Sequence, residues 1–254
     1  MTKLLNAQFH ELFKSKYFYL TSIICVIFGA GLTTGMYLFP QYNQPENSRL
    51  ILTKENILGV VPSFATLLLP FAAAATVAVL LDSQYNHGTI RNMICCGHTR
   101  TAIFFSNLIT MSAAAAIYFV LYQVAAIFMA VCVFDFEGYD LKATVISLSA
   151  MLLMLIFEST VISLLLGNLM RGGKLTIVIL VVQYILNISV VFGMYKYDSI
   201  IADIAAKIFP QSCVFYFSCF AVPEGIWKNF AVSAGLIAVM SLIGLHQFKK
   251  CDIK

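Results

Sequence analysis

The residue types that most often carry out chemistry in proteins show no catalytic arrangement in this chain. There is no GxxxxGK[ST] phosphate-binding loop, no HExxH metal-binding pair and no GxSxG nucleophile motif. The four histidines are scattered: His10, His87, His98 and His246. The seven cysteines lack CxxC spacing, and several lie in apolar runs, where cysteine behaves as a small hydrophobe. We therefore expect no catalytic residue, no metal site and no ATP-binding site.

Glu158 is the one acidic residue in the middle of a long apolar run, LIFESTVIS. A charged side chain at the centre of a bilayer costs roughly 2.5–3.5 kcal/mol on insertion scales. The carboxyl group therefore needs a polar surrounding or a proton. Two hypotheses stay open. Glu158 contacts a polar or cationic substrate, or it holds the bundle together through hydrogen bonds to neighbours such as Ser159, Thr160, Gln183 or Asn187.

The composition indicates where these residues reside. Of the 254 residues 60% are hydrophobic and only 11% are charged, whereas soluble domains carry about 25% charged residues. This chain has too little polar surface to cover a water-exposed globule, so its solvent is the lipid bilayer. The net charge of +4 forms no basic stripe, and we expect no nucleic-acid partner.

Six apolar segments are long enough to cross a membrane as helices. They are residues 17–39, 59–81, 102–134, 143–167, 175–194 and 229–245. The sequence thus predicts an all-α polytopic membrane protein with six transmembrane helices in a single transmembrane domain, 1–254. Its parts are an interfacial helix (1–16), spans one and two (17–81), a connection (82–101), spans three to five (102–194), an outer segment (195–228) and span six with a tail (229–254).

The distribution of lysine and arginine predicts the orientation. With both termini on one side, that side carries most of the basic residues, and the other side carries more acidic than basic residues. The basic residues of the first side are Lys3, Lys14, Lys16, Arg91, Arg100, Arg171, Lys174, Lys249, Lys250 and Lys254. We therefore expect a multi-pass protein of the plasma membrane with both termini cytoplasmic.

Two segments at the predicted cytoplasmic face show a helical pattern without being able to span. In residues 4–18 the apolar residues recur at helical spacing, which favours an interfacial helix over a frayed polar tail. Residues 82–101 form a long connection, and Thr89 and Gly97 are suited to begin and end a short amphipathic helix within it. Such a helix either rests on the membrane or inserts into a groove of a soluble partner.

A third segment, residues 195–228, lies on the predicted outer side. An apolar helical stripe is stopped by Pro210, and residues 214–222 are strongly apolar but too short to cross before Pro223. We expect an extracellular re-entrant hairpin before the last span.

Small residues mark faces on which helices can approach closely. Gly31 and Gly35 form a GxxxG pair in the first span, and alanine runs occur at 72–75 and 113–116. These faces suit either internal packing or a dimer contact.

Together these features resemble the permease subunit of type-2 ATP-binding-cassette (ABC) exporters. The resemblance rests on the interfacial helix, the six spans, the connection with its GTIRNMICCGHTR core and the IFPQSCVFYFSCF hairpin. The positions that match the family's pattern in the connection are Asp82, Gly88, Thr89, Ile90, Arg91 and Arg100.

The resemblance implies a mechanism. Two permease chains, identical or related, pair into a pore, and separate ATPase subunits that bind ATP and Mg dock beneath them to drive export. The residues that it assigns to ATPase docking are Gly88, Thr89, Ile90, Arg91, Asn92, Met93, Ile94 and Gly97. The helix at 4–13 supports this site, and Glu158 is the candidate for the substrate path. Small permeases of this shape also serve in immunity to antimicrobial peptides, which makes an amphipathic peptide the expected substrate.

Two other functions are compatible with a bundle of this kind. A self-contained channel or secondary transporter is expected to show inverted repeats or broken spans with polar midplane residues, and no repeat is visible. A membrane-anchored scaffold or sensor is expected to carry a soluble output domain, and the sequence contains none.

Overall fold

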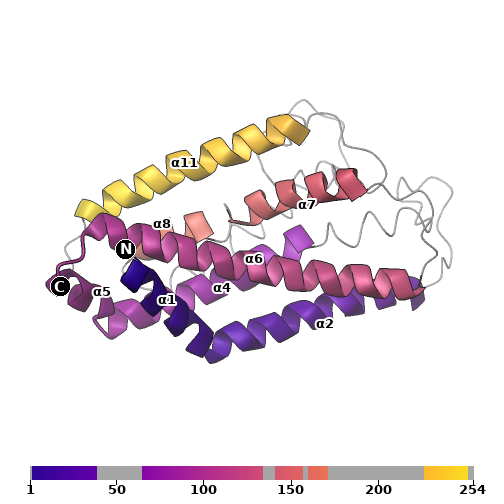
Figure 1. The fold of residues 1–254 in the computed structure, drawn as a ribbon, viewed down its shortest axis with the longest axis horizontal. Coiled ribbons are helices and arrows are strands. Elements are labelled where there is room, and N and C mark those ends of the chain that lie inside the picture. The colour runs from indigo at the N-terminus through magenta and orange to yellow at the C-terminus, as the bar shows by residue number, and fades with distance from the viewer. Residues whose placement is uncertain (1, 39–64, 134–140, 157–159, 171–225, 251–254) are drawn as a thin grey trace.

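The structure is a computed structural model, and it describes residues 2–38, 65–133, 141–156, 160–170 and 226–250. Every element in these ranges is a helix (Figure 1), which confirms the all-α prediction. The helices are α1 (Thr2–Lys14), α2 (Lys16–Leu38), α4 (Ala65–Asn86), α5 (Thr89–Cys95), α6 (Arg100–Val133), α7 (Leu141–Ile156), α8 (Ile162–Met170) and α11 (Ile226–Lys250).

Three of these helices are long and apolar enough to cross a membrane: Lys16–Gly35, Arg100–Cys132 and Phe230–Lys250. They coincide with the first, third and last predicted spans. The second predicted span is described only from Ala65 onwards, as α4, and the fourth is represented by α7 and α8. The fifth span (175–194) and most of the re-entrant segment (195–228) lie outside the described residues, so the number of six spans stays a prediction.

The long helix α6 forms the axis of the bundle (Figure 1), with α2 and α4 packed along it and α11 also in contact with it. Its 34 residues correspond to about 51 Å at 1.5 Å per residue, well beyond the roughly 30 Å of a hydrocarbon core. The bounds of α6 agree with the third predicted apolar segment, 102–134. Near its α5 end, α6 carries three buried polar side chains, Ser106, Asn107 and Thr110.

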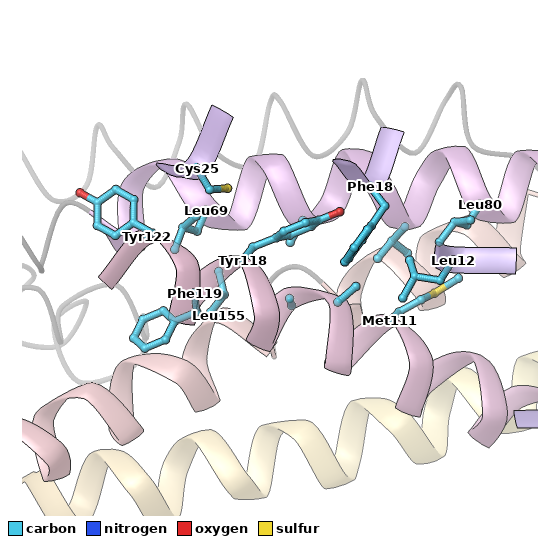
Figure 2. Close-up of a cluster of buried hydrophobic side chains, with 14 of the residues drawn as sticks. Leu12, Phe18, Cys25, Leu69, Leu80, Met111, Tyr118, Phe119, Tyr122 and Leu155 are labelled. Carbon is cyan, nitrogen blue, oxygen red and sulfur yellow. The ribbon is translucent and has the colours of Figure 1, made fainter. Parts of the chain in front are cut away.

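The apolar core follows one side of α6 (Figure 2). Tyr118 and Tyr122 of α6 are fully buried, and Phe18 and Cys25 of α2 and Leu69 of α4 belong to the same cluster. One polar pair lies within this core: the Thr76 hydroxyl is 3.1 Å from the Tyr118 hydroxyl. Pairing of this kind is required where no water can reach.

Helices α2 and α6 approach each other closely at Gly29 of α2. A Cβ atom there would lie 2.6 Å from the backbone oxygen of Tyr122. One turn further along α2, the hydroxyl of Thr33 donates to the backbone oxygen of Ala126 at 3.4 Å. The missing side chain of Gly29 thus lets the two backbones approach, as small residues do in membrane bundles.

The predicted GxxxG pair does not make this contact. No atom lies within 4 Å of the position that a Cβ would occupy at Gly31 or Gly35. The period of an α-helix explains the difference, since Gly29 is turned away from Gly31 by about 200° at 3.6 residues per turn. The alanine runs do pack internally, because Ala73, Ala114 and Ala115 are buried in the core.

Large apolar side chains are exposed along the outer faces of the three long apolar helices. On α2 they are Tyr17, Tyr19, Leu20, Ile23, Ile24, Val26, Ile27 and Phe28. On α6 and α11 they include Val120, Val124, Phe128, Val131, Trp227, Val239 and Leu242. A water-soluble protein rarely exposes so many apolar side chains together. This distribution is typical of helices that face lipid.

The connection expected over 82–101 is mostly helical. Helix α4 continues to Asn86, whose side-chain amide donates to Asp82 at 2.9 Å. Helix α5 begins three residues later, at Thr89, and α6 begins at Arg100. Helix α4 therefore continues for more than a turn past Leu81, the predicted end of the second span, because the apolar run ends before the helix does. Only short turns remain to join the three helices.

Candidate functional site: the α5 end of the bundle

The short helix α5 begins at a glycine in a left-handed conformation. Gly88 has φ 65° at the N-cap position, and no side chain caps the helix. The Gly88 N–H donates to Tyr85 O at 3.2 Å, and Gly88 O accepts the Asn92 N–H at 2.9 Å. Thr89, predicted as the cap, is instead the first helical residue. Gly88 takes the turn because a left-handed backbone is nearly free of strain only for glycine.

The end of α5 is as the sequence predicted. Gly97 has φ 87°, its N–H donates to Ile94 O at 2.9 Å, and the His98 N–H donates to Met93 O at 3.1 Å. This pair of bonds is the Schellman motif, which satisfies the last carbonyls of a helix. Thr99 then caps α6, since its hydroxyl accepts the Ala102 N–H at 3.3 Å. Both ends of α5 are fixed by the backbone.

The apolar side of α5 packs on this chain. Ile90 is 1% exposed and lies in a cluster with Leu4 of α1, Ile103 and Phe104 of α6 and Phe248 of α11. Met93 and Ile94 are partly buried against the same cluster. The start of α1, α5 and the end of α11 therefore meet at one end of the bundle (Figure 1).

The predicted docking residues are thereby divided into two groups. Ile90 is buried by the bundle and is not accessible to a partner, and Met93 and Ile94 are half-buried. Arg91 and Asn92 are exposed on the opposite side of α5, together with Cys95, Cys96 and Gly97. Gly88 and Thr89 are half-buried at the turn. The surface that α5 offers is consequently polar.

Arg100 joins the first turn of α6 to the end of α11. Its Nη1 donates to Lys249 O at 2.7 Å and to Phe248 O at 3.4 Å. These are carbonyls of the last turn of α11, where the helix dipole favours a cation. The second arginine of the connection thus has a structural role inside the chain.

A buried polar network connects α1, α4 and α6 just inside this end. We use the term polar network for Gln8, Glu11, Gln84, Ser106, Asn107 and Thr110. All of these except Glu11 are buried. Asn107 donates to Gln84 Oε1 at 3.0 Å and accepts from Gln8 Nε2 at 2.5 Å. Gln8 Oε1 accepts from the hydroxyls of Ser106 and Thr110.

Glu11 is the acidic member of the polar network. Its Oε2 accepts from Gln84 Nε2 at 3.5 Å. Partial burial raises the pKa of Glu11 above its usual value, while the bond from Gln84 and the nearby charge of His87 act in the opposite direction. A carboxyl group in this position favours protonation in the folded protein.

One further bond extends the junction to α8. The Tyr85 hydroxyl donates to Asn168 Oδ1 at 2.9 Å, and Asn168 is buried. Helices α1, α4, α6, α8 and α11 are therefore joined around α5 by side-chain hydrogen bonds or by apolar packing. A displacement of α5 is expected to move several helices together, because close-packed interiors transmit strain.

Sequence patterns did not reveal the polar network as a site. Gln84 follows an apolar run, and Asn107 and Thr110 lie inside one, in IFFSNLIT. A side-chain amide in an apolar helix needs a hydrogen-bond partner. The amides of Gln84 and Asn107 were therefore the one sequence feature that could have indicated the polar network. The partner itself could not be predicted, since Gln8 and Asn107 are 99 positions apart.

Glu158, the predicted substrate-path residue, lies outside the described residues. Its described neighbour Thr160 donates to Ile156 O at 2.5 Å and lies 3.3 Å from the Ser112 hydroxyl of α6. Among the residues that the structure describes, no three His, Cys, Asp or Glu side chains are grouped so as to hold a metal ion.

No protein-family model matches this chain, and none of the curated proteins matches its sequence.

Proposed function

We propose that this chain is the membrane-spanning permease subunit of an ABC exporter, which moves an amphipathic substrate outward with ATP hydrolysed by a separate subunit. The support comes from the α5 end of the bundle and from the sequence resemblance. A permease without a nucleotide site must receive force from outside. That requires an exposed element that is rigidly attached to the spans.

The observation that carries the proposal is the attachment of α5. Its ends are fixed by left-handed glycines at 88 and 97, and Ile90 is buried among side chains of α1, α6 and α11. Its opposite side exposes Arg91 and Asn92. We therefore assign ATPase docking to the polar side of α5, with Arg91 as the main contact and with the backbone turns holding it in place.

The polar network supplies a route from this surface into the membrane. Through Gln84 and Asn107 it joins α4 and α6, which flank α5 in the chain, and through Gln8 it joins α1. Docking on α5 and α1 would therefore act on α6, the axis of the bundle. The second permease chain, the peptide substrate and the cytoplasmic location of this end belong to the same proposal.

Two variants test the docking assignment by co-purification with an ABC ATPase subunit. Arg91→Ala with Asn92→Ala removes the exposed polar groups of α5. Since interface hot spots contribute 2 kcal/mol or more, we expect at least about a 30-fold loss of ATPase affinity. Lys250→Ala, an exposed cation at the end of α11, is the matched control and is expected to retain the ATPase.

Thiol labelling gives an independent test. Cys95 and Cys96 are exposed on α5, and Cys132 is exposed at the far end of α6. In a background where Cys213, Cys219 and Cys251 are serine, bound ATPase is expected to slow maleimide labelling of α5 and to leave Cys132 unchanged. Equal labelling of α5 with and without ATPase contradicts the docking site. Transport by the chain alone, without nucleotide, favours a channel or secondary transporter instead.

A further inference from the structure

The junction between α1 and α2 is a sharp elbow with a defined aromatic interior. Ser15 is the only residue between the two helices, and its N–H donates to Leu12 O at 3.1 Å while its O accepts the Phe18 N–H at 3.2 Å. Phe18 is buried, with its ring centroid 5.4 Å from that of Phe13 and 5.4 Å from that of Tyr118. The elbow is therefore a fixed feature of the bundle.

The outer surface of the elbow is both cationic and aromatic. Lys14 and Lys16 are exposed on either side of Ser15. Neither lysine side chain forms an ion pair or hydrogen bond with another described residue. Phe13, Tyr17 and Tyr19 are exposed beside them, the two tyrosines by more than half of their surface. No acidic residue is present in the first turn of α2.

The position of Lys16 is unfavourable for α2 by itself. It is the first residue of the helix, where the helix dipole carries partial positive charge and repels a cation. Lys14 is in the last turn of α1, where a cation is favoured. The elbow combines the positive end of α2 with two cations that have no partner among the residues described, so it is suited to an external anion.

The neighbouring surface indicates which anion. The exposed apolar side of α2 begins directly beyond the elbow and continues through Leu20, Ile23 and Ile27. A ligand at Lys14 and Lys16 would therefore lie at the boundary between a polar surface and a lipid-facing one. Tyrosines that are exposed at such a boundary are typical of the headgroup region of a bilayer.

We propose that the α1–α2 elbow binds the headgroups of anionic phospholipids, with Lys14 and Lys16 holding the phosphate and with Tyr17 and Tyr19 placed among the headgroups. The ligand class is a lipid with net negative charge. The exposed α2 face would accommodate its acyl chains. Because α1 carries Gln8 and Glu11 of the polar network, bound lipid would also hold that network against α6. This inference is independent of the ATPase proposal.

The test is a lipid titration of the purified full-length chain, followed by native mass spectrometry. Dioleoyl phosphatidylglycerol is compared with dioleoyl phosphatidylcholine in each variant. Each basic residue near an anionic surface contributes about 1 kcal/mol, which corresponds to roughly a five-fold effect. Lys14→Gln with Lys16→Gln is therefore expected to reduce the preference for phosphatidylglycerol by about 30-fold if both lysines contribute fully. A reduction of about five-fold corresponds to the contribution of a single lysine.

The matched control is Lys3→Gln with Lys250→Gln, which removes the same charge from exposed positions away from the elbow. The control is expected to keep the preference. An equal loss in both double variants overturns the proposal and indicates a general charge effect. An unchanged preference in the elbow variant overturns it as well, and loss of ATPase binding in that variant would then assign the two lysines to a protein partner.

Discussion

The side-chain amides of Gln84 and Asn107 face each other and exchange two hydrogen bonds. Asn107 Nδ2 donates to Gln84 Oε1 at 3.0 Å, and Gln84 Nε2 donates to Asn107 Oδ1 at 3.4 Å. The two residues lie on α4 and α6, on either side of α5 in the chain. The pair therefore links α4 directly to α6. Helix α5 is held at both ends by backbone turns, and the two helices that it connects are held together by this contact.

Replacing Asn107 by alanine is expected to destabilise the protein. The amides of Gln8 and Gln84 then lose their common partner while they stay buried, and an unsatisfied buried polar group costs about 1–3 kcal/mol. The measurement is thermal unfolding of the purified protein in detergent. Asn92→Ala, on the exposed side of α5, is the control and is expected to change stability by less than about 0.5 kcal/mol.

Replacing Gly29 by alanine is expected to lower stability by roughly 1–3 kcal/mol, the usual cost of overpacking. The new methyl group would collide with the backbone oxygen of Tyr122, which cannot move aside like a flexible side chain. Gly31→Ala has no atom within 4 Å. It is expected to be neutral or stabilising by up to about 1 kcal/mol. Equal effects of both changes would contradict the α2–α6 packing.

Replacing Arg100 by alanine is expected to loosen the end of α11. The carbonyls of Phe248 and Lys249 lose their donor, and the favourable interaction of the cation with the helix dipole, about 0.3–1 kcal/mol, is lost as well. Faster amide hydrogen exchange in the last turn of α11 is the measurement. Arg91→Ala removes an exposed arginine of α5 and is expected to leave this exchange unchanged.

Stability is expected to depend on pH through Glu11. Burial raises its pKa, so the folded state favours the protonated form. The resulting stabilisation is complete below the usual value of about 4.5 and is lost as the pH rises through the raised pKa. The melting temperature is therefore expected to fall across this interval, and Glu11→Gln is expected to abolish that fall.

His87 provides the control for the pH dependence. Its charge favours the ionised form of Glu11, so His87→Gln is expected to raise the pKa of Glu11 further and to move the fall in melting temperature to higher pH. If the melting temperature of Glu11→Gln still falls with rising pH as it does in the unchanged protein, another titrating group is responsible for the pH dependence.

The sequence by itself determined the helical class, the apolar helices and the approximate range of α5. These depend on local properties: the length of apolar runs, helical periodicity, and glycine at 97, which permits a left-handed helix end. The resemblance of the connection and hairpin to ABC permeases could also be stated from residues alone. The extension of α4 to Asn86 was missed, because polarity changes at Leu81 whereas the hydrogen-bonded helix continues.

Only the tertiary structure decided which faces of these helices meet. Gly29 rather than Gly31 packs on α6, although both are equally small, because the rotation of α2 depends on contacts with distant residues. Ile90 is buried against α1, α6 and α11, so the side of α5 that stays exposed is the polar one. Gln8 pairs with Asn107 across 99 positions. Contacts of this kind arise from chain packing in three dimensions, and no local pattern in the sequence specifies them.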